Sequence, residues 1–146
     1  GGVRVPCLMR WPAGIEAGQE SSALLSSLDL FPGFCQLAEI ALPSNWPLDG
    51  LSFIPHLNAR NKTTVTREFL WQTGAHAELG RKSWLAYRVG DMKYLNSPQY
   101  GEFLFNLADD PSEKENLKEN MPELFEEMKR TALDRAAAMR TSSVVP

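Results

Sequence analysis

The chain has 146 residues, the size of one ordinary domain, which can bury about 68–70% of the surface that its unfolded form exposes. Its formal charge of -3 comes without a block of like charges, which argues against nucleic acid or an anionic membrane as the main partner. No apolar run approaches the roughly 20 residues of a membrane span, so we expect no membrane partner.

The first predicted element is a strand over residues 3–11. Apolar residues alternate there with a period of two, which places one apolar row on one face. In the isolated chain it would be an orphan strand, and its exposed edge predicts dimerisation or swapped pairing.

A helix of about three turns is predicted next. Apolar pairs recur at helical spacing from Leu30 to Ala38, and Ser27 or Asp29 could cap its start. Prolines and asparagines from residue 40 to residue 62 then favour an irregular connection, with one short helical turn near residues 54–57.

The second half predicts a small antiparallel sheet of about four strands. Short runs rich in aromatic and branched residues lie at 69–71, 84–89, 92–95 and 103–107. Gly90-Asp91 separates two of them, where a tight hairpin turn belongs.

A C-terminal helix follows from Pro122 to Arg140. Asn120 is the expected cap, with the Glu123 side chain reaching back to it. An apolar stripe should cover one face of the sheet, which makes the fold class α+β. The stripe consists of Phe125, Met128, Ala132, Ala136 and Met139.

The two cysteines, Cys7 and Cys35, are too few for a disulfide framework and lack the spacing of a zinc site. We interpret both as small, buried apolar residues.

Six segments follow one another along the chain, and each alone has a local explanation as a turn or a strand end. They are Gly1-Gly2-Val3-Arg4-Val5-Pro6, Arg10-Trp11-Pro12-Ala13-Gly14, Asp29-Leu30-Phe31-Pro32, Asp49-Gly50-Leu51-Ser52-Phe53, Val89-Gly90-Asp91-Met92-Lys93 and residues 107–117. In this order they resemble the C-terminal third of type I, arylsulfatase-like sulfatases of the alkaline phosphatase superfamily. The most specific match is residues 104–113 followed by Asn116-Leu117, which are similar to the closing signature of that family.

The resemblance implies part of a calcium-dependent hydrolase of sulfate esters. Its nucleophile would be formylglycine, made from Cys or Ser in a Cys-x-Pro-Ser-Arg context. It further implies that residues 1–62 are the tail of the catalytic α/β domain, with the strand, the helix and the irregular connection. Residues 63–146 would be the C-terminal subdomain, with the antiparallel sheet and the last helix.

None of this catalytic machinery maps onto the chain. Neither Cys7 nor Cys35 stands in the modification motif, and the active-site Lys of the family precedes Gly1-Gly2. Asp109 and Asp110 are adjacent carboxylates, but in the family this position belongs to the closing turn. We therefore expect no catalytic residue, no metal ligand and no bound cofactor in these residues, and an inactive chain when it is isolated.

Two residues are candidates for contact with substrate, because loops of this subdomain form the mouth of the pocket in several relatives. His76 follows the first strand of the sheet, and Arg88 flanks the hairpin, as does Lys93. For each the competing interpretation is an ordinary loop residue or a solvated charge on the sheet. Trp71 and Trp84 are expected in the core rather than as platforms for a sugar, and an exposed tryptophan beside His76 would reverse that expectation.

The function that the resemblance implies is sulfuric ester hydrolysis by the intact protein, with this part completing the core and one wall of the substrate cleft. Its partners would be the remainder of its own chain and a sulfated small molecule or sulfated sugar. A periplasmic or secreted location is common in the family. Two alternatives are a non-catalytic interaction module with the same fold and part of a related phosphoester hydrolase.

Overall fold

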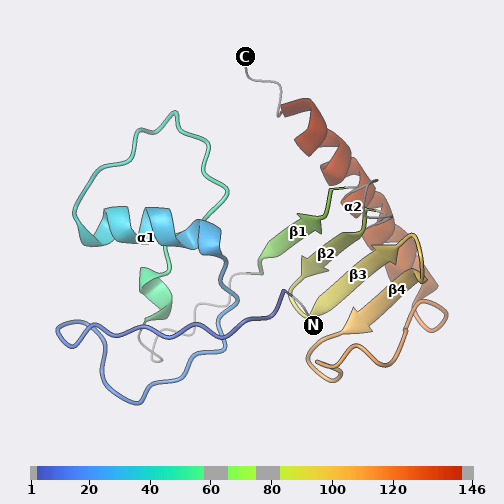
Figure 1. The fold of residues 1–146 in the computed structure, drawn as a ribbon, viewed down its shortest axis with the longest axis horizontal. Helices are drawn as coiled ribbons and strands as arrows, with labels where there is room; N and C mark the ends of the chain where they lie inside the picture. The colour runs from blue at the N-terminus through green and yellow to red at the C-terminus, as the bar shows by residue number, and fades with distance from the viewer. Residues whose placement is uncertain (1–2, 58–65, 75–82, 143–146) are drawn as a thin grey trace. The chain divides into compact units, whose positions relative to one another are not determined.

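The computed structural model describes residues 3–57, 66–74 and 83–142, and the chain divides into two compact units. One unit comprises residues 5–65, and the other joins residues 1–4 to residues 66–146. Figure 1 shows helices in the first unit and a sheet with a long helix in the second. The predicted α+β class is therefore confirmed.

The 5–65 unit is organised around a helix that begins at a capped turn. A short 3-10 helix, η1 (Ser27–Asp29), leads directly into α1 (Leu30–Leu37). The cap is Ser26, whose hydroxyl accepts from the N–H of Leu28, while the Asp29 carboxylate accepts from the N–H of Ser26 at 2.7 Å. The helix is confirmed. Of the two predicted caps, Asp29 occupies the position before α1 but its side chain makes no cap hydrogen bond there, and Ser27 is replaced as the cap of η1 by Ser26, since the reciprocal capping pair requires a spacing of three.

The irregular connection is confirmed over its described part, residues 40–57. One 3-10 turn, η2 (Ile54–His56), interrupts it where a short helical turn was predicted. Two glycines permit close approach to the start of the helix. A Cβ at Gly50 would lie 2.0 Å from the Leu28 carbonyl oxygen, and one at Gly33 would lie 2.2 Å from the Phe53 ring.

The predicted strand over residues 3–11 is wrong. These residues have no strand structure, and no described residue pairs with them in a ladder. Alternation fixes which side chains share a face, but a strand exists only when a neighbour satisfies its backbone groups. The predicted dimerisation has thus lost the strand on which it depended.

Both cysteines also differ from their interpretation as buried residues. The Cys7 side chain is exposed and Cys35 is half-buried. Cys7 is exposed because the 3–11 segment does not pack as a strand. Other apolar side chains of this segment are also exposed, among them Leu8 at 98%.

The other unit contains the predicted four-stranded antiparallel sheet. Its strands are β1 (Glu68–Gln72), β2 (Leu85–Val89), β3 (Met92–Ser97) and β4 (Gly101–Asn106), in the order β1-β2-β3-β4. Gly90 and Asp91 form the turn between β2 and β3, and Gly90 has φ +55°. A positive φ is easily adopted by glycine, which explains its place in this two-residue turn.

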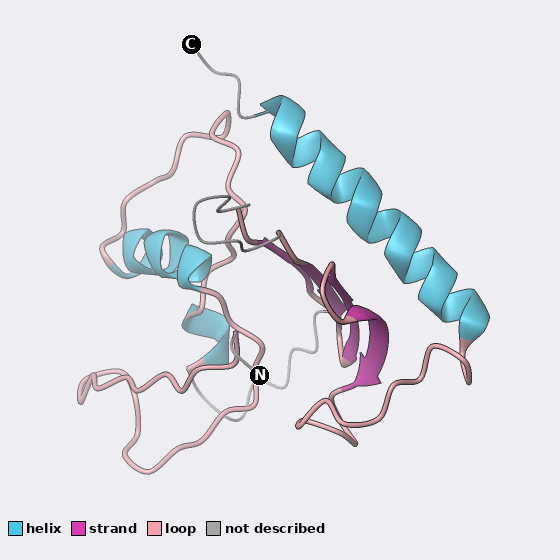
Figure 2. Ribbon diagram, turned by 45° about the vertical axis from the view of Figure 1, so that its right-hand side comes forward, coloured by secondary structure: helices cyan, strands magenta, loops and turns pink. Residues whose placement is uncertain are grey.

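The last helix, α2 (Pro122–Ser142), lies along one face of this sheet (Figure 2). Its buried side chains pack on Leu85, Tyr87, Tyr94 and Leu104 of the sheet and form the core of the unit. They are Phe125, Met128, Ala132 and Ala136. No helix within the described ranges is long and apolar enough to cross a membrane.

Two details of α2 correct the sequence-based expectation. Met139, the last member of the predicted stripe, is 54% exposed. The N–H of Phe125 donates to the carbonyl of Met121, which places Met121, rather than Asn120, at the cap position before Pro122. Pro122 at the first helical position needs no partner for an N–H, so the start is stable without the predicted cap.

The outer edge of β4 is covered by the loop that precedes α2. We call residues 110–117 the strap. Asn116 Oδ1 accepts from the N–H of Leu104 at 3.0 Å, and the Leu117 N–H donates to the Leu104 carbonyl at 2.8 Å. Asp110 Oδ2 accepts from the N–H groups of Lys114 and Glu115, which fixes the bend of the strap. The closing signature therefore satisfies backbone groups of an edge strand.

Candidate functional site

The sheet has a second face, opposite α2, which carries most of its aromatic side chains. The register aligns Phe69 with Arg88, Arg88 with Lys93 and Lys93 with Phe105, so these four share one face. Tyr87, Tyr94 and Leu104 alternate with them and point to α2. We call the face opposite α2 the open face. It consists of Phe69, Trp71, Ala86, Arg88, Lys93, Leu95, Phe103 and Phe105.

A hollow of about 460 Å³ lies on this open face. Aromatic rings dominate its wall. The Phe103 and Phe105 rings are stacked, with centroids 5.7 Å apart and planes 10° from parallel. Trp84 and Tyr100 complete the aromatic lining, together with the aliphatic side chain of Leu95.

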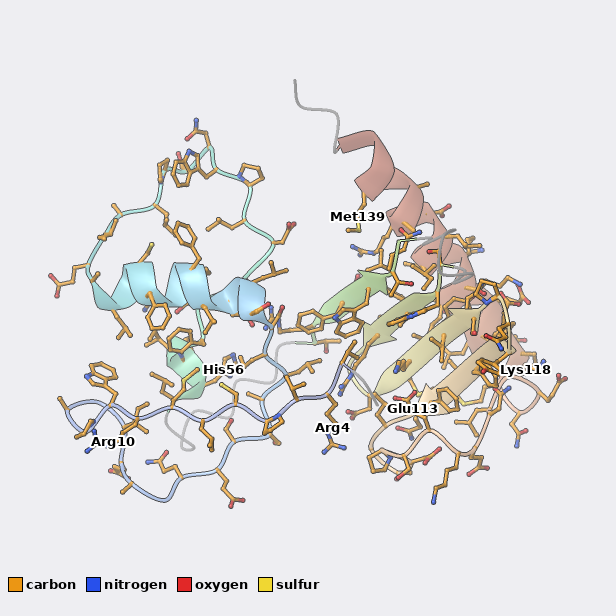
Figure 3. The ribbon with its side chains drawn as sticks, viewed as in Figure 1. Arg4, Arg10, His56, Glu113, Lys118 and Met139 are labelled. Carbon is orange, nitrogen blue, oxygen red and sulfur yellow. The ribbon has the colours of Figure 1, made fainter. Side chains whose placement is uncertain are left out.

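One ion pair lies in the wall of the hollow. Lys93 Nζ is 2.8 Å from Glu113 Oε1, and the two side chains are only 7% and 15% exposed (Glu113 is labelled in Figure 3). Burial alone would raise the pKa of Glu113, but contacts that include the hydrogen bond from Lys93 outweigh it and lower that pKa below 4.5. Lys93 is therefore a buried, paired cation and not the solvated sheet charge that the sequence suggested.

The strap presents Glu113 to Lys93 through an uncommon backbone conformation. Glu113 has φ +57°, a left-handed value that disfavours residues other than glycine by roughly 1–2 kcal/mol. Such a residue persists where its surroundings hold it, and here the ion pair does so.

The two predicted substrate contacts have different outcomes. His76 lies outside the described residues. Arg88 lies on the open face, where its Nε donates to the Gly90 carbonyl at 2.6 Å and one terminal nitrogen lies 3.5 Å from Asp91 Oδ1. The guanidinium thus braces the β2–β3 turn and does not line the hollow. Contact of Arg88 with a substrate stays a prediction.

The two tryptophans expected in the core lie instead on or beside the open face. Trp71 is half-buried and stacks on Phe69 at a centroid distance of 5.6 Å. Trp84 is also half-buried and lines the hollow. The sign that would favour a sugar platform, an exposed tryptophan beside His76, is not tested, because His76 lies outside the described residues.

A polar network joins the sheet to α2 on its other face. Glu102 accepts from the Tyr94 hydroxyl at 2.6 Å and from Lys129 Nζ at 2.8 Å. Burial would raise the pKa of Glu102, but the bonds from Lys129 and Tyr94 outweigh it, so this pKa lies below 4.5. Burial, followed by the Glu102 carboxylate, raises the pKa of Tyr94. The sequence pattern gave no sign of this network, because its members lie on three separate elements.

The calcium ion implied by the resemblance does not fit the described residues. Asp109 accepts from the side chain of Asn106, and Asp110 accepts from two backbone N–H groups, so both carboxylates serve the turn. A hard cation needs roughly six to eight oxygen ligands that converge on one point. Within the described ranges, no three His, Cys, Asp or Glu side chains gather in that way.

Comparison with known proteins identifies relatives over most of the chain. Residues 1–138 match the family model described as "N-sulphoglucosamine sulphohydrolase, C-terminal". The chain is 32% identical over 139 residues to arylsulfatase G of Rattus norvegicus, and 28% identical over 137 residues to an N-acetylgalactosamine-6-O-sulfatase of Bacteroides thetaiotaomicron. These alignments cover 86% and 87% of the chain.

Solved structures agree with this result. The crystal structure of Ps i-CgsB in complex with k-i-k-neocarrahexaose matches 83% of the chain with a TM-score of 0.70 and 30% identity. The chain covers only 26% of that structure and 26% of each of the two sequence relatives. It therefore spans about a quarter of the length of the proteins that it matches.

Proposed function

Because the chain belongs to the family described as N-sulphoglucosamine sulphohydrolase, C-terminal, we propose that the intact protein is a hydrolase of sulfate esters of which this chain forms the C-terminal portion. The observation that carries the proposal is the match over residues 1–138, which includes the strap with its closing signature. Relatives from a mammal and a bacterium, both named sulfatases, support it.

In this proposal, the chain completes the fold of the intact enzyme and forms one wall of its substrate cleft. The strap, the capped η1 turn before α1 and the core under α2 use their polar groups for internal contacts, and the described carboxylates do not assemble a metal site. The nucleophile and the calcium ligands would come from other residues of the intact enzyme, where the ion would stabilise charge on the sulfate oxygens. The 146-residue chain alone is then inactive.

The substrate class that we propose is a sulfated saccharide rather than another sulfated small molecule. One relative is named for a sulfated N-acetylgalactosamine, and the structure with 30% identity was determined with a neocarrahexaose. An aromatic hollow on the open face suits sugar rings, which stack on aromatic side chains. A cleft wall of this kind would set selectivity through contacts with the group that bears the sulfate.

The experiment compares the full-length protein with the 146-residue chain on matched aryl sulfate and aryl phosphate substrates. We expect the full-length protein to release sulfate much faster than phosphate, and the shorter chain to release neither. Faster phosphate release would favour a phosphoester hydrolase. Inactivity of a folded full-length protein toward sulfated saccharides and aryl sulfates alike would favour a non-catalytic module.

A further inference from the structure

We propose that Glu102 is an acid-sensitive latch, which holds the strap and the first half of α2 on the sheet and releases them together when its carboxylate takes up a proton. The inference concerns a conformational change within this part of the protein, and it does not depend on the proposed function. It stands on the position of Glu102, where β3, α2 and the strap meet.

The Glu102 carboxylate binds two of these elements at once. Oε1 accepts from the Tyr94 hydroxyl of β3 at 2.6 Å, and Oε2 accepts from Lys129 Nζ of α2 at 2.8 Å. Tyr94 is completely buried, whereas the Lys129 and Glu102 side chains are 30% and 28% exposed. The carboxylate is therefore accessible to protons from solvent, although the tyrosine that it binds lies in the core.

The main chain of Glu102 binds the third element, the strap. Its carbonyl accepts from Asn116 Nδ2 at 3.3 Å, while Asn116 Oδ1 accepts from the N–H of Leu104, two residues further along β4. Residues 118–121 alone separate the strap from the start of α2. Glu102 thus fixes two points, Asn116 and Lys129, of one continuous stretch that runs from residue 110 to residue 129.

The charges around Glu102 make its neutral form a weak latch. Burial would raise its pKa, but the hydrogen bonds from Lys129 and Tyr94 and the charge of Lys118 outweigh it and lower that pKa below 4.5. A protonated carboxyl group no longer attracts either lysine, and Lys129 then keeps an acidic neighbour, Glu126, on its own helix. The latch is therefore closed above pH 4.5 and opens as the pH falls through the pKa of the folded state.

A second contact of the same composition holds the other half of α2 and provides an internal reference. Glu68, on the opposite edge strand β1, accepts from the Tyr87 hydroxyl at 3.0 Å and pairs with Arg135. Arg135 lies in the second half of α2, whereas Lys129 lies in the first. Loss of the Glu102 charge should therefore loosen the first half of α2 more than the second.

The test is hydrogen exchange of the intact protein, followed by mass spectrometry from pH 7 to pH 3 and corrected for the intrinsic exchange rate at each pH. We expect peptides from residues 110–129 to lose about tenfold or more of their protection in acid, and peptides from β2 and β3 to lose clearly less. Glu102→Gln should show this loss already at pH 7, with little further change in acid, because its side chain carries no charge at any pH.

Two further substitutions separate a latch from a merely structural contact. Lys129→Met should lower the protection of residues 110–129 at pH 7 and reduce its pH dependence, whereas Lys129→Arg should restore both. This pair keeps the carboxylate, so it tests the inference even if Glu102→Gln does not fold. Glu127→Gln, at an exposed position of α2, is the matched control and should behave as the wild type at every pH.

Three results would overturn the inference. They are an equal loss of protection in the sheet and in residues 110–129 as the pH falls, a pH dependence in Glu102→Gln that equals that of the wild type, and a loss in α2 without one in the strap. The last result would show that the two elements open separately. None of these readouts involves ester hydrolysis, so failure of the latch and failure of the proposed function are distinguishable.

Discussion

Asp29 and Leu51, which are 22 residues apart in the chain, are joined by a hydrogen bond in which the Leu51 N–H donates to Asp29 Oδ1 at 2.9 Å. The other carboxylate oxygen accepts from the Ser26 N–H, and the side chain is completely buried. Two of the six signature segments thus meet at one carboxylate. This contact explains why an aspartate at the start of α1 and the segment around Gly50 occur in the same chain.

Asp29→Ala should lower the free energy of unfolding of the 5–65 unit by about 2–4 kcal/mol, because two backbone N–H groups in part-buried hydrogen bonds lose a charged, completely buried acceptor. Urea unfolding followed by far-UV circular dichroism measures the loss. Asp49→Ala, at an exposed position, is the control and should change stability by less than about 0.5 kcal/mol. Equal effects of the two substitutions would refute a special role for Asp29.

Gly50→Ala should lower the free energy of unfolding by about 3 kcal/mol, similar to Asp29→Ala, because the new methyl group would lie 2.0 Å from the backbone carbonyl oxygen of Leu28. The main chain cannot rotate away as a side chain could. Gly74→Ala is the matched control, since a Cβ there meets no heavy atom within 4 Å. Comparing urea midpoints of the two variants tests the prediction, and a wild-type midpoint for Gly50→Ala contradicts it.

Glu102 should make stability dependent on pH in the acid range. The pKa of Glu102 is lowered in the folded protein. Its contribution to stability is therefore fully present above pH 4.5, and it is lost as the pH falls through the pKa of the folded state. Glu102→Gln should therefore be less stable than the wild type near neutral pH, with a difference that shrinks below pH 4.5. Urea unfolding at a series of pH values tests this, with Glu127→Gln, at an exposed position of α2, as the control. A difference that is constant with pH would contradict the prediction.

The Lys93–Glu113 pair should show strong coupling. Glu113→Ala leaves a buried ammonium group without its partner and should cost about 3 kcal/mol. In the double variant Lys93→Met, Glu113→Ala, neither charge of the pair remains. The loss of unfolding free energy in the double variant should therefore be smaller than the sum of the losses in the two single variants by roughly 1 kcal/mol or more. A double-mutant cycle on unfolding free energies gives this coupling. Additive costs would show that the two charges act independently.

Asn116→Ala should open the outer edge of β4 locally. The Leu104 N–H loses its acceptor, so its amide hydrogen exchange should accelerate by about tenfold or more, equivalent to roughly 1–2 kcal/mol. Exchange at Tyr87, in the interior strand β2, should change less. Asn120→Ala, an exposed neighbour before α2, is the control. Unchanged protection at Leu104 would refute the role of the strap.

The sheet could be predicted from the sequence because its signals are local. Gly90-Asp91 specifies a two-residue turn, and the alternation on either side places Tyr87 and Tyr94 on the face toward α2. The strand over residues 3–11 failed for the opposite reason. Its pattern was equally regular, but a strand depends on a partner that the pattern does not contain.

The site was less predictable than the fold. The sequence alone predicts a solvated charge at Lys93. Its partner Glu113 lies 20 residues later, in a loop whose path is set by Asp110, and the sequence does not show that the two side chains meet. Arg88 was identified, but its guanidinium binds backbone two residues away. Trp84 was recognised as a ring with two possible roles, and only the three-dimensional register decides what lies beside it.

The strap also limits how copies of this chain can aggregate. Because residues 110–117 hydrogen-bond the outward N–H of Leu104 and the carbonyls of Glu102, Leu104 and Asn106 in β4, an incoming strand would have to join the sheet at β1 instead. In two molecules paired through β1, the outer edge of each β4 would already be hydrogen-bonded to its own strap. Growth would end at a pair, and a fibril built by adding sheet to sheet would have no second end from which to lengthen.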